Sequence, residues 1–341
     1  MLETVKTLCD IVGVSGRETA VADKIEELVK PYADTVYRDA LGNLIVYKKG
    51  AKAPSAPIML AAHMDEVGFL VSYITEKGLI KLINAGGVYG QSLAGRTLYF
   101  PRSGIYGVFG KAPIHVRKKE DEAKVPKLDD LYVDIGALTK EEAEKYVRLG
   151  DVAAFDTELR EFGDGCILGK AIDDRLGCAL LIELLKKDLP VDCHFAFTVQ
   201  EELGLRGAGT AAFAVRPKTA IVIDCCGAAD NAGFKENDVI AKSGAGPVIS
   251  YADHATLYDY ELYNAVTKLA DDNGIKWQTK TRISGGTDAG SIHTSADGVK
   301  VIGISIASRN IHSAASTASL KDASDALTLT EKVLEYLVNV Q

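Results

Sequence analysis

Residues 58–65 read IMLAAHMD, and this stretch decides how the rest of the chain is interpreted. Its first five residues are all apolar, which is typical of a strand that is buried on both faces of a sheet. His63 and Asp65 follow directly, where such a strand ends. In open α/β sheets, functional side chains gather beyond the carboxyl ends of the strands. The stretch therefore predicts an α/β sheet with a functional site at one edge.

Three further apolar runs end in a similar way. FAFTV leads to Glu201 and Glu202, AIVI leads directly to Asp224, and VIGISIA is followed shortly by His312. Taken singly, each residue is weak evidence, because a lone histidine or a pair of adjacent carboxylates is usually a solvated or satisfied polar group. Four strands that deliver histidine and carboxylate side chains to the same edge are a stronger signal.

A fifth element brings more negative charge, since Asp173 and Asp174 open a segment whose next turns are apolar. These two residues could simply cap a helix, where the helix dipole favours acidic side chains. Two histidines and three or four carboxylates in one place would repel one another unless cations sit among them. Imidazole with carboxylate suits two borderline metals. A pair of metals about 3.5–4 Å apart typically serves hydrolysis.

The organisation of the chain changes twice. Between residues 67 and 164, short β-rich runs alternate with Gly and Pro turns, which predicts a small all-β barrel or sandwich. A short helix interrupts it, with Thr139 as N-cap and Glu142 three residues on. On both sides of this block, strands and helices alternate. We therefore expect a three-layer α/β/α sandwich from residues 1–66 and 165–341, interrupted by the β domain 67–164.

Local sequence patterns predict a helix cap, two helices and a strand. Ser15 and Glu18 match the S-x-x-E capping box ahead of an amphipathic helix. Residues 258–273 and the segment from Leu320 onward have helical patterns, and a strand is expected near 277–281.

Composition excludes several classes of protein. The net charge of −8 argues against a nucleic-acid partner, which needs a basic face. No run approaches the roughly 20 apolar residues of a membrane span, and the first ten residues lack the features of a signal peptide. The six cysteines show no CxxC spacing, which favours a reducing compartment. We expect a cytoplasmic protein, in which the mixed-charge run at 117–124 is a solvated loop.

Six segments together resemble the M42 family of metallopeptidases, which includes the glutamyl aminopeptidases and the tetrahedral (TET) aminopeptidases. The resemblance covers essentially the whole chain, and the motifs occur in the family's order. These segments are AAHMDEVGFLV (61–71), GKAIDDRLG (169–177), TVQEELGLRGA (198–208), AIVID (220–224), SGGTDAGSIH (284–293) and SRNIHS (308–313).

The resemblance implies a role for each candidate residue. His63 and Asp224 would bind the first of two divalent metal ions, and Glu202 and His312 the second. Asp173 would bridge both ions, next to a cis peptide bond with the following residue. The implied metal is zinc, with cobalt and manganese as alternatives.

Two further roles complete the implied site. Glu201 would be the general base that takes a proton from the attacking water. Asp65 lies two residues after His63, so on an extended strand both side chains point the same way, and Asp65 can hold the imidazole's second N–H.

Several alternatives stay open at this point. Asp174 could be the bridging ligand, the roles of Glu201 and Glu202 could be exchanged, and Asp65 could merely cap a turn. Thr287 and Asp288 either line the substrate pocket or cap a helix. We treat the other four histidines as non-ligands; these are His115, His194, His254 and His293.

The resemblance also implies substrates and assembly. It predicts removal of residues from peptides with free N-termini, and a homo-oligomer from dimer to dodecamer that assembles through the β insert. A two-metal hydrolase of another amide bond, such as an amidase or deacetylase, and a non-catalytic scaffold protein are the alternatives. One departure is visible, because the family commonly follows its last histidine with Ser-Pro and a glutamate, whereas His312 is followed by SAAST.

Overall fold

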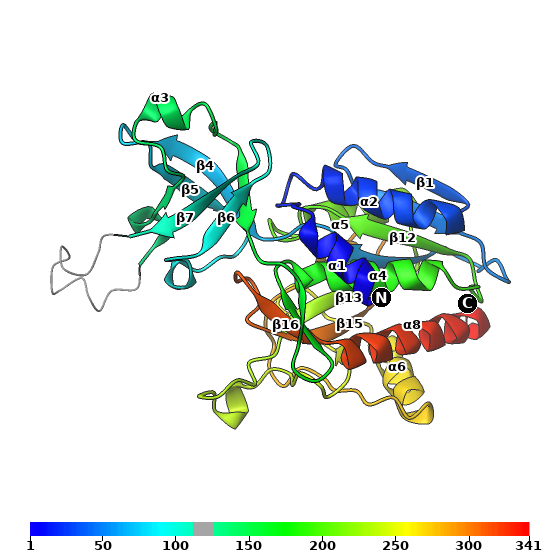
Figure 1. The fold of residues 1–341 in the computed structure, drawn as a ribbon. Coiled ribbons are helices and arrows are strands. Elements are labelled where there is room, and N and C mark those ends of the chain that lie inside the picture. Colours follow the sequence, from blue (N-terminus) through cyan, green and yellow to red (C-terminus); the bar gives the residue numbers. More distant parts are fainter. Residues whose placement is uncertain (112–125, 341) are drawn as a thin grey trace.

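The computed structural model describes residues 1–111 and 126–340. A large sheet with helices on both sides forms one part, and a closed barrel lies beside it (Figure 1). The predicted α/β/α sandwich with an inserted β barrel is thereby confirmed. Two predictions, the solvated run at 117–124 and the non-ligand role of His115, lie outside the described residues. In the described ranges, no helix has both the length and the apolar character that a membrane span requires.

The large sheet brings four parallel strands together at its centre. In spatial order its strands are β1 (Thr35–Arg38), β2 (Leu44–Lys48), β12 (Cys193–Thr198), β3 (Ile58–His63), β13 (Thr219–Gly227), β15 (Lys300–Arg309), β16 (Ser316–Ser319), β11 (Cys166–Gly169) and β10 (Arg160–Phe162), and β14 (Val248–Ser250) also pairs with β15. β12, β3, β13 and β15 are parallel to their neighbours within this group. Their carboxyl ends therefore share one edge.

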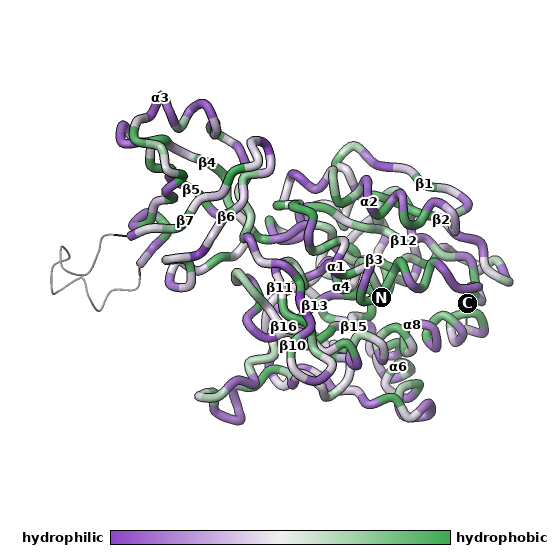
Figure 2. Tube along the Cα trace, in the orientation of Figure 1, coloured by the Kyte–Doolittle hydropathy of each residue, from purple (hydrophilic) through white to green (hydrophobic). Residues whose placement is uncertain are grey.

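Helices cover both faces of this sheet and divide its core in two. Residues Ile58, Leu60 and Ala62 of β3 join the core on one face, whereas Met59 and Ala61 join the core on the other. This is why the strand is apolar at every position. The first face is covered by α1 (Leu2–Asp10), α2 (Thr19–Val29), α4 (Ile172–Leu185), α6 (Tyr260–Asp272) and α8 (Leu320–Val340), and the second by α5 (Arg206–Val215) and α7 (Ala289–Ile292). Along α8, apolar and polar residues alternate as one-sided burial requires (Figure 2).

The inserted barrel has a core of its own. Its strands close in the order β4 (Gly68–Ile74), β5 (Ile80–Ala85), β8 (Tyr132–Asp134), β7 (Ile105–Gly110), β6 (Thr97–Phe100) and β9 (Val152–Phe155). Phe69 packs edge-on against Phe109 and Phe155 at its centre. The predicted cap of α3 (Lys140–Ala143) is confirmed, because the Thr139 hydroxyl accepts the backbone N–H of Glu142. β10 already pairs in the large sheet, so the chain rejoins that sheet before residue 164.

Short 3₁₀ turns complete the secondary structure: η1 (Lys30–Tyr32), η2 (Gly90–Ser92), η5 (Leu128–Asp130) and η6 (Glu236–Asp238). The strand expected near 277–281 is wrong, since this segment makes only a single bridge from Gln278 to Val248. The side-chain amide of Gln278 donates to the carbonyls of Lys242 and Gly246, and these bonds fasten the segment to loops instead of a sheet.

The predicted capping box is also wrong. α2 begins directly after Glu18, yet no side chain caps it. The Ser15 hydroxyl instead donates to the carboxylate of Asp65, and Glu18 accepts the backbone N–H groups of Gly16 and Gln200. The S-x-x-E pattern therefore ties the N-terminal segment to the loops at the edge of the sheet, where a buried carboxylate offers Ser15 a stronger partner than a helix end.

A buried ion pair links the point where the chain leaves the large sheet for the barrel to the segment between β11 and α4. Glu66 follows β3, and Lys170 precedes α4; the Lys170 Nζ lies 3.0 Å from both carboxylate oxygens of Glu66. Glu66 Oε1 also accepts the backbone N–H of Gly13 at 2.9 Å. Arg175 lies 3.6 Å from this carboxylate and is fully buried. The pair therefore joins the end of β3, where the chain leaves for the barrel, to the start of α4.

We expect Glu66→Gln to lower the free energy of unfolding by about 3–5 kcal/mol, because it leaves the buried Lys170 ammonium without its counter-charge. The matched control is Glu27→Gln, which breaks the exposed pair with Lys24 and should cost about 0–1 kcal/mol. Urea unfolding of both variants, followed by circular dichroism, measures the difference. Equal transition midpoints for the two variants would contradict this assignment.

Candidate metal centre

The carboxyl edge of the parallel strands opens into a cavity of about 630 Å³. Five elements carry the candidate residues there: the end of β3, the start of α4, the turn after β12, which carries two of them, the middle of β13 and the loop after β15. The cavity-lining residues include His63, Asp173, Glu201, Glu202, Asp224 and His312. The sequence-predicted residues thus meet at one place, as expected from four parallel strands that end at a common edge.

Asp173 lies between the two imidazoles. Its Oδ1 lies 3.2 Å from Nε2 of His63, and its Oδ2 lies 3.4 Å from Nε2 of His312. Nε2 of His63 is also 3.7 Å from Oδ1 of Asp224, and Nε2 of His312 is 3.2 Å from Oε2 of Glu202. One carboxylate therefore faces two nitrogen–oxygen pairs, one on each side.

The potential ligand atoms also form compact groups. Atoms of His63, Asp173 and Glu202 lie within 4.8 Å of one another, as do those of His63, Asp174 and Asp224. One oxygen of Asp174 accepts the N–H of Gly177 at 3.0 Å, whereas its Oδ2 is buried and has no hydrogen-bond partner in the described residues. Buried carboxylate oxygens need a donor or a cation. The donor set and this unpaired oxygen therefore fit divalent cations.

Two details go beyond the expected donors. The peptide bond between Asp173 and Asp174 is cis, as the resemblance implied. The thiol of Cys225 also lies within 4.8 Å of the Asp173 and Asp174 ligand atoms. Sequence reasoning missed this sulfur, although its position directly after Asp224 was a signal, because β13 carries both residues to the same edge.

Burial and mutual repulsion raise the pKa values of most of these carboxylates, whereas contacts with the imidazoles lower the pKa of Asp173. Burial raises the pKa of Glu202 to about 7, and the charge of Asp173 adds to this rise. Burial likewise raises the pKa values of Glu201, Asp174 and Asp224 well above their ordinary range. For Asp173, burial is outweighed by the hydrogen bonds to the two imidazoles, and its pKa falls. So much negative charge cannot remain ionised here without nearby positive charge.

The two imidazoles respond to the same crowding. Burial alone would lower the pKa of His312, but its hydrogen bond with Asp173 and the charge of Glu202 raise it to about 9. The pKa of His63 is likewise raised, because its contacts with Asp173 and Asp65 outweigh burial. In the absence of cations, protons therefore take the place of the missing positive charge.

Asp65 contacts both the His63 imidazole and the turn after β12. Its Oδ1 lies 3.5 Å from Nδ1 of His63, and the same nitrogen is 3.2 Å from the Asp65 carbonyl oxygen. The two carboxylate oxygens also accept the backbone N–H groups of Glu201 and Glu202, at 2.9 and 3.1 Å. The sequence predicted contact with the imidazole but not the bonds to the turn. Asp65 therefore fixes an imidazole and the turn that carries two glutamates.

The barrel supplies part of the cavity wall. A Cβ atom added at Gly86 would lie 3.2 Å from Cβ of Glu202, and one added at Gly87 would lie 3.3 Å from Nδ1 of His312. The turn after β5 therefore packs directly against these two side chains, and a larger residue at either position would press on them.

Thr287 and Asp288 are not among the residues that line the cavity. The Thr287 hydroxyl accepts the N–H of Ala289 at 3.2 Å, a local bond just before α7, and no side chain caps that helix. The Asp288 carboxylate does not cap; it accepts the hydroxyl of Thr198, and burial raises its pKa to about 6. In the described part of the chain, the compact ligand groups contain none of His194, His254 and His293, although His254 lines the cavity.

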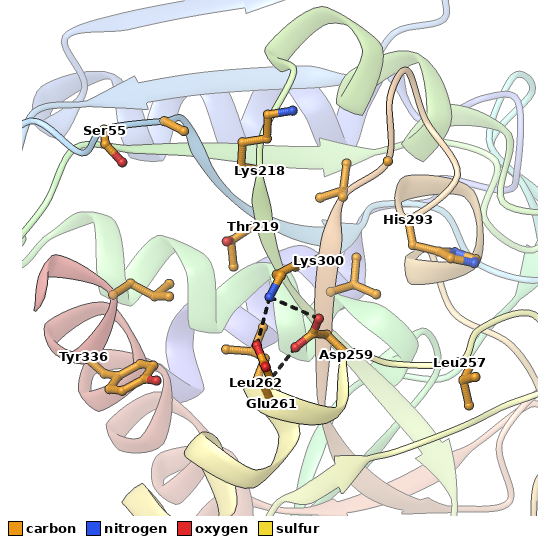
Figure 3. Close-up of a pocket in the computed structure, with 15 residues that line it drawn as sticks. Ser55, Lys218, Thr219, Leu257, Asp259, Glu261, Leu262, His293, Lys300 and Tyr336 are labelled. Carbon is orange, nitrogen blue, oxygen red and sulfur yellow. Dashed lines mark hydrogen bonds and ion pairs between the residues drawn. The ribbon is translucent and has the colours of Figure 1, made fainter. Parts of the chain in front are cut away.

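A second cavity, of about 710 Å³, lies at the opposite ends of β13 and β15 (Figure 3). It is larger, but its charged groups already pair with one another. Lys300 contacts Asp259 and Glu261, and Lys218 contacts Asp297. Because these charges are paired and the other cavity gathers histidine and carboxylate side chains, we take the smaller, acidic cavity as the candidate functional site.

Comparison with known proteins agrees with this geometry. The profile of the family described as M42 glutamyl aminopeptidase matches residues 42–329. A protein of Acetivibrio thermocellus that is named as an aminopeptidase is 38% identical over 331 residues, covering 96% of this chain and 97% of its own. The aminopeptidase APDkam598 of Desulfurococcus kamchatkensis superposes with a TM-score of 0.92 at 35% identity, covering 99% of this chain and 97% of its own. The TET1 peptidase of Pyrococcus horikoshii superposes with a TM-score of 0.85 at 33% sequence identity. The match covers 97% of this chain and 98% of that peptidase.

The fold and these matches over nearly the whole chain define a peptidase. The chain belongs to the M42 family of glutamyl aminopeptidases and is an enzyme of that family.

We expect cation binding to weaken steeply as the pH falls from 8 to 6. Glu202 and His312, with pKa values of about 7 and 9, bind a cation only after losing a proton, so protons compete increasingly at lower pH. At least one proton must leave for each cation bound, which predicts a loss of about tenfold or more in affinity for each pH unit. Calorimetric titration of the metal-stripped protein with Mn²⁺, in buffers of different ionisation enthalpy, measures both quantities. An affinity that is independent of pH, without proton release, would contradict the assignment.

Proposed function

We propose that this chain is a two-metal aminopeptidase that removes single residues from peptides with free N-termini. The observation that supports this most directly is the position of Asp173 between two imidazoles, with one oxygen toward each. On this proposal Asp173 would be shared by two cations, His63 and Asp224 would hold the first, and Glu202 and His312 would hold the second. Zinc is the proposed metal, and cobalt and manganese accept the same donors.

The proposed ligand sets give each cation three protein ligands, which leaves room for water and substrate. Asp174 is a competing carboxylate, because its ligand atom lies within 4.8 Å of those of His63 and Asp224. We do not assign Asp174 as the bridging ligand, because a bridging carboxylate needs both oxygens and one oxygen of Asp174 already accepts the N–H of Gly177.

When bound, the two cations would supply an acidified water and a positive charge against the substrate carbonyl. Glu201 has the position of the general base, because its carboxylate lines the cavity beside the ligands. Burial raises the pKa of this carboxylate, so it readily holds a proton at an Oε atom. It takes the proton from water and delivers it to the nitrogen of the leaving peptide.

Asp65 acts as the positioning residue in this scheme. Because it accepts the N–H groups of both Glu201 and Glu202, it sets the direction of the base and of a ligand together. Its contact with Nδ1 of His63 also leaves Nε2 directed toward Asp173. Such outer contacts fix ligand orientation and tune basicity.

The carboxylates that line the cavity also give a reason why the enzyme would select substrates with a free N-terminus. A substrate ammonium is attracted to carboxylates, and the adjacent carbonyl then lies where the water is activated. We further propose a cytoplasmic location, which the six free cysteines support, because reducing compartments keep thiols unpaired.

Assembly is proposed by analogy. The TET1 peptidase of Pyrococcus horikoshii assembles into a tetrahedron or a large octahedral shell. We propose that this chain also forms a homo-oligomer, from dimer to dodecamer, through the inserted barrel. The barrel's exposed side chains include Tyr89, Tyr106 and Leu138, which are available for such contacts.

We expect Glu201→Gln to keep its metal while kcat falls by about 10²–10⁴-fold, since it removes the base and leaves the ligands. Asp173→Ala should lose both cations, because one bridging carboxylate balances two charges. Elemental analysis with kinetic assays separates these outcomes. Glu236→Gln, an exposed glutamate, is the control and should match the unsubstituted enzyme. Loss of metal from the Glu201 variant would show that the roles of Glu201 and Glu202 are exchanged.

Matched peptides with free and acetylated N-termini test the activity itself. We expect stepwise release of single residues from the free peptides, and no cleavage of the acetylated ones, because acetylation removes the positive charge and adds bulk at the acidic wall. Incubation with enzyme and metal, followed by mass spectrometry over time, gives the order of the products. Equal cleavage of both peptides, or internal fragments that appear first, would favour an amidase or endopeptidase.

A further inference from the structure

The thiol of Cys225 lies at the metal centre, yet the proposed mechanism does not use it. Its Sγ, one oxygen of Asp173 and one oxygen of Asp174 all lie within 4.8 Å of one another. This compact group contains neither of the two imidazoles. Cys225 also lines the acidic cavity and is 6% exposed, so the sulfur can be reached from the cavity.

The strand directs this sulfur away from the neighbouring carboxylate. Successive residues of β13 point to opposite faces of the sheet. Cys225 belongs, with Ile223, to the core on the face that α4 covers, whereas Val222 belongs to the core on the other face. Cys225 and Asp224 therefore leave the strand in opposite directions. Asp174 lies between them, because its ligand atoms group with Asp224 on one side and with Cys225 on the other.

Two atoms of the Cys225 group are available to a cation. Oδ2 of Asp174 is buried and has no hydrogen-bond partner among the described residues, and a buried carboxylate oxygen needs a donor or a cation. Sγ of Cys225 lies 3.5 Å from the carbonyl oxygen of Ile172, a weak bond because a thiol is a poor donor. The thiol of Cys178, by contrast, donates to a carbonyl oxygen at 3.0 Å and belongs to no compact ligand group in the described part of the chain.

We propose that Cys225, Asp173 and Asp174 form a further position for a thiophilic divalent cation such as Cd²⁺, and that its occupation inhibits the enzyme. Soft cations prefer sulfur ligands, whereas Mn²⁺ prefers oxygen. The incoming cation replaces the thiol proton, which passes to water. The inhibition rests on the proposed function, in which the two oxygens of Asp173 are directed toward the two catalytic cations. A cation held by Cys225 competes with them for this carboxylate.

Titration of the Mn²⁺-loaded enzyme with Cd²⁺ tests the position directly. A cadmium–thiolate bond has an ultraviolet charge-transfer absorption that bonds to imidazole and carboxylate lack. We expect this absorption to saturate with a single Cd²⁺ per chain, and to be absent from Cys225→Ser and Cys225→Ala. Cys226→Ser is the matched control, because Cys226 lines the same cavity with the same 6% exposure but belongs to no compact ligand group in the described residues. It should keep the absorption.

Peptide cleavage during the same titration measures the inhibition. We expect the Cd²⁺ concentration for half-inhibition to rise by about 10-fold or more in Cys225→Ser. Outer contacts of metal ligands are worth about 10- to 100-fold in affinity, and a direct ligand should be worth at least as much. Each variant is compared with its own rate without Cd²⁺, and its manganese content shows whether the site is intact. Cys226→Ser should match the unsubstituted enzyme.

The two measurements separate the possible failures. Half-inhibition at the same Cd²⁺ concentration in Cys225→Ser would show that Cd²⁺ acts by replacing the catalytic cations, and it would overturn the inhibitory role. Absorption that persists in both Cys225 variants, or that disappears in Cys226→Ser, would overturn the binding position. Failure of the Mn²⁺-loaded enzyme to cleave any peptide would overturn the aminopeptidase function. The absorption needs no activity, so it decides the role of Cys225 in that case as well.

Discussion

The structure depends on concentrating negative charge at the buried edge of a parallel sheet. Four strands end there side by side, and the start of α4 adds two further aspartates. Carboxylates at this density raise one another's pKa values, and burial reinforces the effect. The fold can keep them ionised only when cations lie among them. The same feature that makes this region unfavourable for an empty protein therefore makes it a strong site for divalent metal.

A layer of fixed contacts directs these groups. Asp65 holds the turn that carries Glu201 and Glu202, and Ser15 donates to Asp65 from the N-terminal segment. Glu18 accepts the N–H of Gln200 just before that turn. Helix, strand and turn are thus joined through carboxylates that do not face the cavity, and their positions limit how the ligands can move.

The sequence contained most of the fold and the identity of the metal-centre candidates, because both follow from one regularity. Apolar runs such as that before His63 fix the strands, and the residues directly after them are placed by the parallel arrangement. What escaped prediction depends on contacts distant in sequence. Ser15 reads as a helix cap until the position of Asp65 is known. The segment 277–281 has the pattern of a strand but is held by side-chain bonds to loops.

The residues that form the cavity wall could not be predicted from the sequence either, for the same reason. Nothing in the pattern of the insert indicates that the turn after β5 reaches the neighbouring domain. The close approach of Gly86 and Gly87 to Glu202 and His312 depends on how the barrel rests against the sheet. Local sequence determines that a turn forms there, whereas the docking of two cores determines what it touches.

This contact gives the barrel a role in the electrostatics of the site. The side chain of His312 is 32% exposed, whereas that of His63 is 2% exposed, so the two halves of the centre meet water to different extents. The backbone of Gly86 and Gly87 lies against the more open half, next to Glu202 and His312, and occupies space that water would otherwise fill. Interactions between charges strengthen as the dielectric constant falls. Both domains therefore contribute to the electrostatic surroundings of Glu202 and His312.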